Sequence, residues 1–318
     1  MNKKTVTIIG AGLMGSGIAA CSTLGGYPTI LVDQKLELAN AGVSKAKQNL
    51  NQLLENKIID LDQADSAQAL LQAGSDLERA VKGSFLIIEA VSENLSLKQE
   101  LFKRLDELAS PDVIIASNTS GLRITDIAKY ATHPERMVTT HFWFPAHLVP
   151  LVEVVIGEKT DEAVAIQIHK LLLEWKKAPV IVKKDLPGQL ANRILQAIIR
   201  EAINIVQMGL ATPEDVDTAI KMGMGLRFPA WGPLEHIDGV GLDLALSVQR
   251  DVLPGLDNDP VPSKYLQGLV DQGNLGFKTG KGFYDWQEKD MQELAAKRDH
   301  FIIEALRILK ENSPTGQA

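Results

Sequence analysis

The chain has 318 residues, 45% of them apolar and 23% charged, with a formal net charge of -7 at pH 7. Such a composition is typical of a globular protein of one large or two ordinary domains, and the acidity argues against nucleic-acid and anionic-membrane partners. The sequence contains no run of roughly 18 apolar residues that could cross a membrane. Because it has a single cysteine, Cys21, and no signal-peptide pattern ahead of residue 5, we expect a cytoplasmic protein whose partner is a small molecule.

The first pattern in the chain is a β-branched run at residues 5–9, followed by three spaced glycines and a helical pattern over residues 16–24. A strand, a Gly-x-Gly-x-x-Gly turn and a helix in this order are typical of a dinucleotide-binding unit. The turn lets the backbone approach a pyrophosphate, and the helix N-terminus offers it unpaired N–H groups. The cofactor contacts expected in the turn are Gly10, Gly12, Leu13, Met14 and Gly15.

A second strand is expected at residues 28–32, and Asp33 follows it directly. An acidic side chain at the end of this strand accepts hydrogen bonds from the ribose hydroxyls of a dinucleotide. The same charge would repel an adenosine 2′-phosphate. Asp33 therefore indicates NAD rather than NADP as the cofactor.

Helical and strand patterns then alternate along the next part of the chain. We expect a helix over residues 35–57, strands at residues 85–88 and 113–115, and between them a helix that begins with Ser96 as its N-cap. Residues 58–82 are polar and alanine-rich, and we expect one or two shorter helices there. The alternation predicts an α/β fold with a Rossmann-type, doubly wound parallel sheet.

Ligands of such a sheet bind at the carboxyl ends of its strands. Four polar side chains follow two of the expected strands and should share this edge: Glu93, Ser117, Asn118 and Ser120.

The segment from Thr139 to Val155 places two polar residues where the surrounding pattern is apolar, His141 and Glu153. If the chain folds back between them, Glu153 accepts the proton of one imidazole nitrogen and leaves the other nitrogen basic. A catalytic base oriented by a carboxylate is one interpretation. A buried hydrogen bond that only ties two strands together is the other.

The alternation of strands and helices ends near Pro187 and Gly188, and only helical patterns follow. We expect a Rossmann domain over residues 1–186 and an all-helical domain over residues 187–318. The helix over residues 189–208 is apolar on nearly every face, which predicts burial on all sides and a homodimer interface as its cover. Asn192 interrupts this helix near its start and needs either a hinge partner or a ligand.

The assembled motifs resemble the L-3-hydroxyacyl-CoA dehydrogenase family over nearly the whole chain, to about residue 286. The resemblance implies that His141 is a general base, that Glu153 orients it, and that Ser120 and Asn192 contact the substrate oxygen. No metal takes part in this chemistry. The cofactor contacts that the resemblance implies are Glu93, Lys98, Ser120 and Lys278.

The sequence departs from the family pattern at two places. Phe144 stands where the family has an asparagine next to the chemistry, and the segment between Gly225 and Gly232 is about three residues longer than in typical acyl-CoA enzymes. The longer segment is similar to the branch that contains lambda-crystallin and the gulonate and carnitine dehydrogenases. In it, Arg227 either clamps a substrate carboxylate or only caps or pairs with Glu235.

These features predict an NAD-dependent oxidoreductase that converts a short-chain L-3-hydroxyacyl-CoA, of the 3-hydroxybutyryl-CoA type, to its 3-oxo product in fatty acid metabolism. An alternative substrate is a small free 3-hydroxy acid held by Arg227. A third possibility is a structural protein that binds NAD without turnover.

Overall fold

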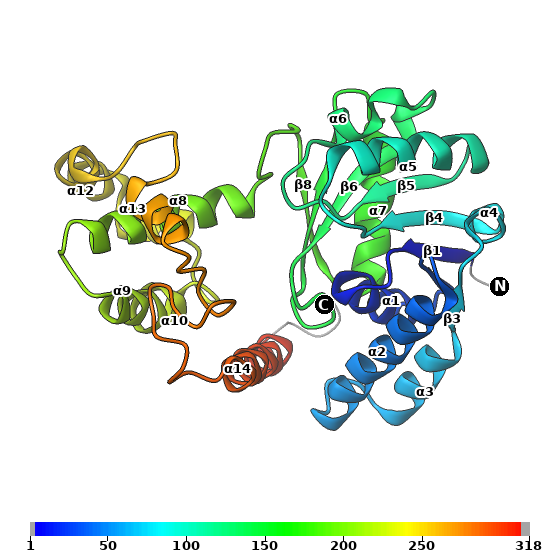
Figure 1. Cartoon of the computed structure of the whole chain (residues 1–318), viewed down its shortest axis with the longest axis horizontal. Helices are drawn as coiled ribbons and strands as arrows, with labels where there is room; N and C mark the ends of the chain where they lie inside the picture. The colour runs from blue at the N-terminus through cyan, green and yellow to red at the C-terminus, as the bar shows by residue number, and fades with distance from the viewer. Residues whose placement is uncertain (1–3, 313–318) are drawn as a thin grey trace. The chain divides into compact units, whose positions relative to one another are not determined.

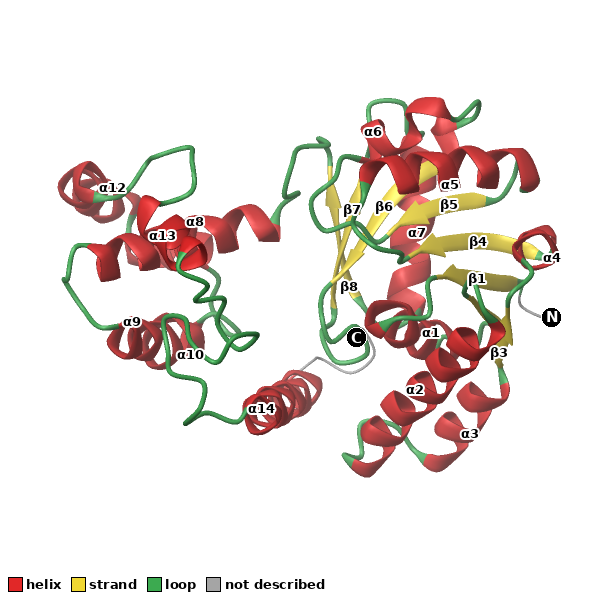
Figure 2. Ribbon diagram, in the orientation of Figure 1, coloured by secondary structure: helices red, strands yellow, loops and turns green. Residues whose placement is uncertain are grey.

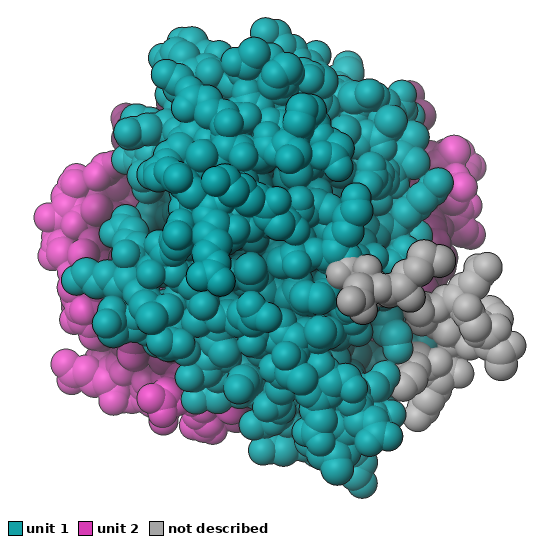
Figure 3. Space-filling model, turned by 90° about the vertical axis from the view of Figure 1, so that its right-hand side faces the viewer, with its two compact units in different colours: residues 1–192, 301–318 teal, residues 193–300 magenta. Residues whose placement is uncertain are grey.

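The structure is a computed structural model of the chain, and it describes residues 4–312. By their internal contacts these residues form two compact units, shown in different colours in Figure 3. Unit 1 holds residues up to Asn192 together with the chain from Phe301 onward, and unit 2 is Arg193–His300. The domain boundary that we expect after residue 186 stays a prediction.

Unit 1 is built on one sheet of eight strands in the order β3-β2-β1-β4-β5-β6-β7-β8 (Figure 1). All neighbouring strands are parallel except β6 and β7, which run antiparallel. The expected α/β fold with a doubly wound sheet is confirmed. The strands are β1 (Thr5–Ile9), β2 (Thr29–Val32), β3 (Leu71–Gly74), β4 (Ser84–Glu89), β5 (Ile114–Ser117), β6 (Met137–Phe142), β7 (Leu151–Val155) and β8 (Ala178–Val182).

Helices cover both faces of the sheet, as Figure 2 shows. Leu86 and Ile88 of β4 pack with α1, α2 and α7, whereas Ile87 between them packs with α5 and α6. Successive side chains of a strand point to opposite faces, so a continuous apolar strand is buried on both. The helices of unit 1 are α1 (Leu13–Leu24), α2 (Leu36–Glu55), α3 (Leu61–Ala69), α4 (Leu77–Lys82), α5 (Leu95–Leu108), α6 (Ile124–Ile127) and α7 (Glu162–Glu174).

One local expectation in unit 1 is wrong, and another is confirmed but incomplete. The N-cap of α5 is Asn94, whose side chain accepts from the Leu97 amide at 3.0 Å, and Ser96 instead donates to Asn94. Residues 58–82 hold two short helices as expected, α3 and α4, and also the strand β3, which was not expected. This strand was missed because Leu71 is its one buried residue, so its sequence carries almost no apolar signal.

The regular elements of unit 2 in its described residues are all helices, joined by loops, with isolated bridges near Lys281. A π-helical turn, Ile220–Met224, separates α9 from α10. The helices that lie in it or enter it are α8 (Ala191–Gln207), α9 (Pro213–Ala219), α10 (Gly225–Arg227), α11 (Pro233–Val240), α12 (Leu242–Val252), α13 (Lys264–Asp271) and α14 (Met291–Asn312). The expected all-helical C-terminal part is confirmed.

The helix after residue 189 is not buried by the chain itself, and the second copy that we expect to cover it stays a prediction. No residue of α8 is buried, and Ile194 is 54% exposed. Among the described residues from 193 to 300, only Val216 is buried. Apart from Val216, the apolar side chains of unit 2 are therefore at most half-buried within the chain that the structure describes.

The C-terminal half of α14 belongs to unit 1. Ile303 is 2% exposed and packs with Leu53 of α2 and Leu148 of the loop that follows β6. Arg307 adds a hydrogen bond to the carbonyl oxygen of Asn56. In the part of the chain that the structure describes, no helix is long and apolar enough to span a membrane.

Candidate active site

The antiparallel pairing of β6 and β7 places His141 directly opposite Glu153. The imidazole Nδ1 and the carboxylate Oε2 are 2.7 Å apart, and both side chains are buried. Side chains of directly opposed residues lie on the same face of an antiparallel pair, so the register alone brings the two groups together.

Four groups donate hydrogen bonds to the Glu153 carboxylate. Oε2 accepts from His141 Nδ1 at 2.7 Å and from Trp143 Nε1 at 3.0 Å, and Oε1 accepts from the amides of Leu190 and Ala191 at 2.9 and 2.8 Å. Burial raises the pKa of Glu153, but the bonds from His141, Ala191, Trp143 and Leu190 outweigh it and lower the pKa to about 2. A carboxylate that is charged at neutral pH can only accept, so the shared proton lies on His141 Nδ1.

Glu153 also caps the first turn of α8. The amides of Leu190 and Ala191 stand at the start of this helix, where backbone N–H groups have no partner within the helix. A carboxylate accepting both bonds is further stabilised by the positive end of the helix dipole. The same side chain thus serves the histidine and the segment that leaves unit 1.

The second imidazole nitrogen of His141 faces Ser120, with Nε2 3.2 Å from the hydroxyl oxygen. Ser120 lies in the turn after β5, and Glu93 holds this turn. Glu93 Oε1 accepts from the Thr119 hydroxyl at 2.6 Å and from the amides of Ser120 and Gly121 at 3.0 and 3.1 Å. His141 and Ser120 therefore have a defined mutual position before any ligand binds.

A network of charges lies behind this turn, with Lys98 and Glu89 buried and Glu93 exposed. The ammonium group of Lys98 is 2.6 Å from Glu89 and 3.3 Å from Glu93, and Ser117 donates to the other oxygen of Glu89 at 2.6 Å. Burial raises the pKa of Glu93, but the Thr119 hydroxyl and the Lys98 charge outweigh it and lower the pKa. Lys98 is thus satisfied by two carboxylates, and its contact with the cofactor stays a prediction.

Sequence reasoning missed Glu89 as part of this network. A charged residue at the last position of a buried strand, nine residues before a lysine on the next helix, was the available signal. A charge at such a position needs a partner.

The hinge segment before unit 2 is bound to the Ser120 turn. The Asn192 amide group donates to the carbonyl oxygen of Ser120 at 2.9 Å, and Gln189 donates to that of Thr119 at 2.9 Å. Asn192 therefore has a partner in the protein, and its side-chain NH2 group carries a second N–H besides the one that this bond uses. Phe144, in the loop after β6, is 49% exposed.

A cavity of about 1000 Å³ opens at the carboxyl ends of β1, β2 and β4 and is lined by Gly10, Gly12 and Asp33. A side-chain carbon on Gly10 would lie 2.6 Å from the Ala90 carbonyl oxygen, and one on Gly15 would lie 1.8 Å from that of Gly10. A carbon on Gly12 would meet nothing within 4 Å. Packing therefore requires Gly10 and Gly15, whereas the open space at Gly12 fits the close approach of a cofactor pyrophosphate.

Asp33 stands beside this turn, and its carboxylate oxygens accept from the amides of Ala11 and Gln34, both at 2.8 Å. Leu13 and Met14 open α1, with Leu13 exposed. The far end of the cavity was not anticipated, because it is formed by the segment after β3 and by α5. Its lining there includes Ser75, Asp76, Leu77, Leu101 and Arg104.

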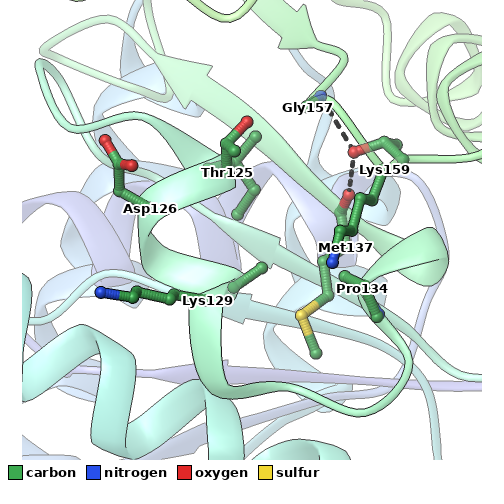
Figure 4. Close-up of a pocket in the computed structure, with 10 residues that line it drawn as sticks. Thr125, Asp126, Lys129, Pro134, Met137, Gly157 and Lys159 are labelled. Carbon is green, nitrogen blue, oxygen red and sulfur yellow. Dashed lines mark hydrogen bonds between the residues drawn. The ribbon is translucent and has the colours of Figure 1, made fainter.

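A second, smaller cavity of about 290 Å³ lies at the amino end of β6, on the opposite edge of the sheet from His141 (Figure 4). Its wall includes Met137 and the hydroxyl of Thr160, which donates to the Met137 carbonyl at 2.6 Å and accepts from the Gly157 amide at 2.9 Å. None of the site residues predicted from the sequence lines it.

Two predicted site residues belong to unit 2. Arg227 ends α10, and Lys278 lies exposed in the loop between α13 and α14. Among the described residues of unit 2, the Arg227 guanidinium has no hydrogen bond or ion pair. Glu235 instead caps α11, accepting from the Gly232 amide at 2.8 Å. No bond therefore joins Arg227 and Glu235 among the described residues, and the role of Arg227 stays a prediction.

Residues 5–186 match the family model described as 3-hydroxyacyl-CoA dehydrogenase, NAD binding domain, and residues 188–286 match the model of its C-terminal domain. The chain is 38% identical to the probable 3-hydroxybutyryl-CoA dehydrogenase of Bacillus subtilis, covering 91% of this chain and 99% of that protein. It is 33% identical to the 5-formyl-3-hydroxy-2-methylpyridine 4-carboxylate 5-dehydrogenase of Mesorhizobium japonicum, covering 96% and 98%.

The structure is also similar to the crystal structure of a dehydrogenase of that pyridine carboxylate, described as an NAD+ dependent dismutase. The TM-score is 0.90 at 32% identity, and the match covers 98% of this chain and all of the other.

Proposed function

The chain belongs to the 3-hydroxyacyl-CoA dehydrogenase family. We propose that it oxidises the hydroxyl group of a small free 3-hydroxy acid with His141 as the general base. It is an NAD-dependent oxidoreductase. The observation that carries the proposed role of His141 is the position of its two ring nitrogens. Glu153 holds Nδ1 at 2.7 Å, and Nε2 faces the Ser120 hydroxyl at 3.2 Å.

In the proposed reaction, the substrate hydroxyl gives its proton to Nε2 of His141. The carboxylate of Glu153 stays charged and stabilises the imidazolium that forms. The Ser120 hydroxyl and the Asn192 amide polarise the oxygen as it becomes a carbonyl. When bound, NAD would supply the acceptor for a hydride from the carbon that bears the hydroxyl, so that the alcohol would lose one hydride and one proton, which are two electrons and two hydrogens in all.

Residues that would hold NAD lie at the large cavity. Gly12 leaves room for the pyrophosphate, and the N-terminus of α1 offers backbone amides to it. Asp33 retains lone pairs for the ribose hydroxyls besides the two amide bonds that it accepts. Glu93 orders the turn that presents Ser120.

A free carboxylate on the substrate is supported by Arg227. Its guanidinium has no partner among the described residues of unit 2, and a bidentate bond to a carboxylate is the contact that guanidinium groups favour. The relative from Mesorhizobium japonicum, similar over 96% of this chain, is named for a pyridine carboxylate. Phe144 also stands where the family pattern has an asparagine, so the side-chain amide expected next to the reacting group is missing.

Short-chain 3-hydroxyacyl-CoA is the second candidate substrate. The family description and the 38% identity to a probable 3-hydroxybutyryl-CoA dehydrogenase favour it. Both candidates use the same base and the same cofactor, and they differ in what holds the rest of the substrate.

Rates of NAD reduction with free 3-hydroxybutyrate and other small hydroxy acids, compared with 3-hydroxybutyryl-CoA, test the two substrates. We expect turnover of an acid and at least a hundredfold loss in His141→Ala. Turnover of the CoA ester alone would reject the free acid. Turnover of either substrate that is unchanged in His141→Ala would reject the proposed base. NAD binding without any turnover would support a structural protein.

The proposed carboxylate clamp has a matched control in unit 2. Arg227→Gln should raise the KM for the free acid by about tenfold to a hundredfold, the range of one charged contact. Arg250, an exposed arginine of α12, should tolerate the same change to glutamine. Equal KM values in Arg227→Gln and Arg250→Gln would exclude Arg227 from the substrate site.

We further propose that unit 2 pairs with a second copy of the chain. Its helices expose large apolar side chains such as Ile194, Leu234 and Leu242, whereas stable monomers rarely expose extended apolar surface. Closed two-fold pairs are the commonest assemblies of identical chains. Light scattering coupled to gel filtration should give the mass of a dimer, and a monomer mass at micromolar concentration would reject this proposal.

A further inference from the structure

The indole N–H of Trp143 donates to the same carboxylate oxygen that receives the proton of His141. The distance from Nε1 to Glu153 Oε2 is 3.0 Å, and the Trp143 and His141 ring centroids are 5.7 Å apart. The indole is only half-buried, but its N–H points to a carboxylate that is fully buried. One oxygen of Glu153 thus serves two donors.

The strand register accounts for this arrangement. His141 pairs with Glu153 across β6 and β7, and Trp143 follows two residues later on the same side of the chain. A residue two positions along from a directly opposed pair is the diagonal neighbour of the partner, within reach of a long aromatic side chain. A phenylalanine at position 143 would place its ring next to Glu153 in the same way, but it has no N–H group to donate to the carboxylate.

We propose that Trp143 is a positioning residue of the general base, which fixes Glu153 Oε2 and shares its negative charge with His141. The inference rests on the proposed function of His141. Each donor to an anionic oxygen reduces its strength as an acceptor for the other. With Trp143 in place, the carboxylate orients the imidazole but stabilises its protonated form less strongly. The imidazole therefore stays neutral, and can act as a base, down to lower pH.

Other charged groups reach His141 from the neighbouring elements. Glu153 on β7 makes direct contact, and Glu93 and Lys98 are linked to it through the backbone amide of Ser120. The amides of Leu190 and Ala191 act on the other oxygen of Glu153. A change at Trp143 leaves all of these groups in place, so its effect on titration can be separated from theirs.

The test uses the full-length enzyme with Trp143→Phe, which removes the donor and keeps an aromatic ring. Trp143→Leu is a second variant without a donor, in case the first repacks. Trp175→Phe is the matched control, because the buried indole nitrogen of Trp175 has no hydrogen-bond partner among the described residues. All variants are compared by the pH dependence of kcat/KM and by NMR titration of imidazoles labelled with carbon-13, with His141→Gln to assign the signal.

Both Trp143 variants should move the acidic limb of kcat/KM and the His141 titration to higher pH by about half a unit, the scale of a shared hydrogen bond to a charged group. Trp175→Phe should leave both curves in place. An unmoved His141 titration in Trp143→Phe and Trp143→Leu, or a shift to lower pH, would overturn the role of Trp143.

The NMR titration does not require turnover, so the two proposals fail separately. If His141→Gln retained full activity, the proposed base would be rejected, while the titration would still decide whether Trp143 acts on His141. If His141→Gln were inactive and the titration did not move, the base would stand without Trp143.

Discussion

The two units of the chain differ in how much of their apolar surface the chain itself covers. In unit 1, closed apolar clusters lie on both faces of the sheet, and charged residues such as Glu89 and Lys98 are buried in pairs. From Arg193 to His300, Val216 is the only buried residue that the structure describes. Helices that expose this much apolar surface indicate that another molecule covers them.

This difference in burial indicates which unit can hold the catalytic base and which unit can bind partners or the rest of the substrate. A buried base pair such as His141 and Glu153 needs surroundings that are fixed without help from a partner, and unit 1 supplies them. Unit 2 offers exposed, unpaired groups such as Arg227 on helices that lack their own core. We therefore expect changes in unit 1 to act on the chemistry and changes in unit 2 to act on assembly and substrate choice.

The largest expected effect is that of Glu153→Gln in unit 1. An amide cannot stabilise the imidazolium as a carboxylate does, so the rate should fall by about four powers of ten while NAD affinity changes little. Steady-state kinetics and NAD titration measure the two quantities. Glu174→Gln, which alters a carboxylate that accepts from Tyr27 at the surface, is the control. A loss of less than about tenfold would mean that the pair is structural.

The next effect concerns the end of α14, where the last helix packs on unit 1. Ile303→Ala should reduce the free energy of unfolding by about 2–5 kcal/mol, because it removes a buried side chain from between Leu53 and Leu148. Ile308→Ala on the same helix is the control, since Ile308 is 57% exposed and should cost less than about 0.5 kcal/mol. Urea denaturation compares them, and equal losses would show that α14 does not pack there.

Unfolding at different protein concentrations tests the contrast between the units directly. Trp143 and Trp175 lie in unit 1, and Trp231 and Trp286 lie in unit 2. If both tryptophans of one unit are changed to phenylalanine, the remaining tryptophan fluorescence reports on the unfolding of the other unit. A tenfold rise in concentration should stabilise unit 2 by about 1.4 kcal/mol per dimer and leave the unit 1 transition in place. Two transitions that both ignore concentration would contradict a dimer.

The smallest expected effect is on cofactor choice. Asp33→Ala removes a negative charge from the cavity at Gly12 and should reduce the preference for NAD over NADP by about tenfold in kcat/KM. Asp76→Ala, another acidic residue of the same cavity, shows whether any lost charge has this effect. An unchanged ratio in Asp33→Ala would show that Asp33 does not face the ribose.

Local sequence patterns determined the glycine turn, Asp33, the alternation of strands and helices, and the position of His141 at the end of a strand. Each of these depends on neighbours within one or two elements, where spacing and residue type are sufficient. The segment around His141 and Glu153 belongs to this class, because the two residues are 12 positions apart and one chain reversal joins them.

Only the tertiary structure decided the features that join distant parts of the chain. The edge strand β3 exists through its pairing with β2, the α14 residue Ile303 packs on a loop far earlier in the sequence, and Glu153 caps α8 from 37 residues away. Buried polar groups take whichever partners the fold brings within bonding distance, and such partners leave no periodic pattern in the sequence. For the same reason the bond from Trp143 to Glu153 became visible only when the register of β6 and β7 was known.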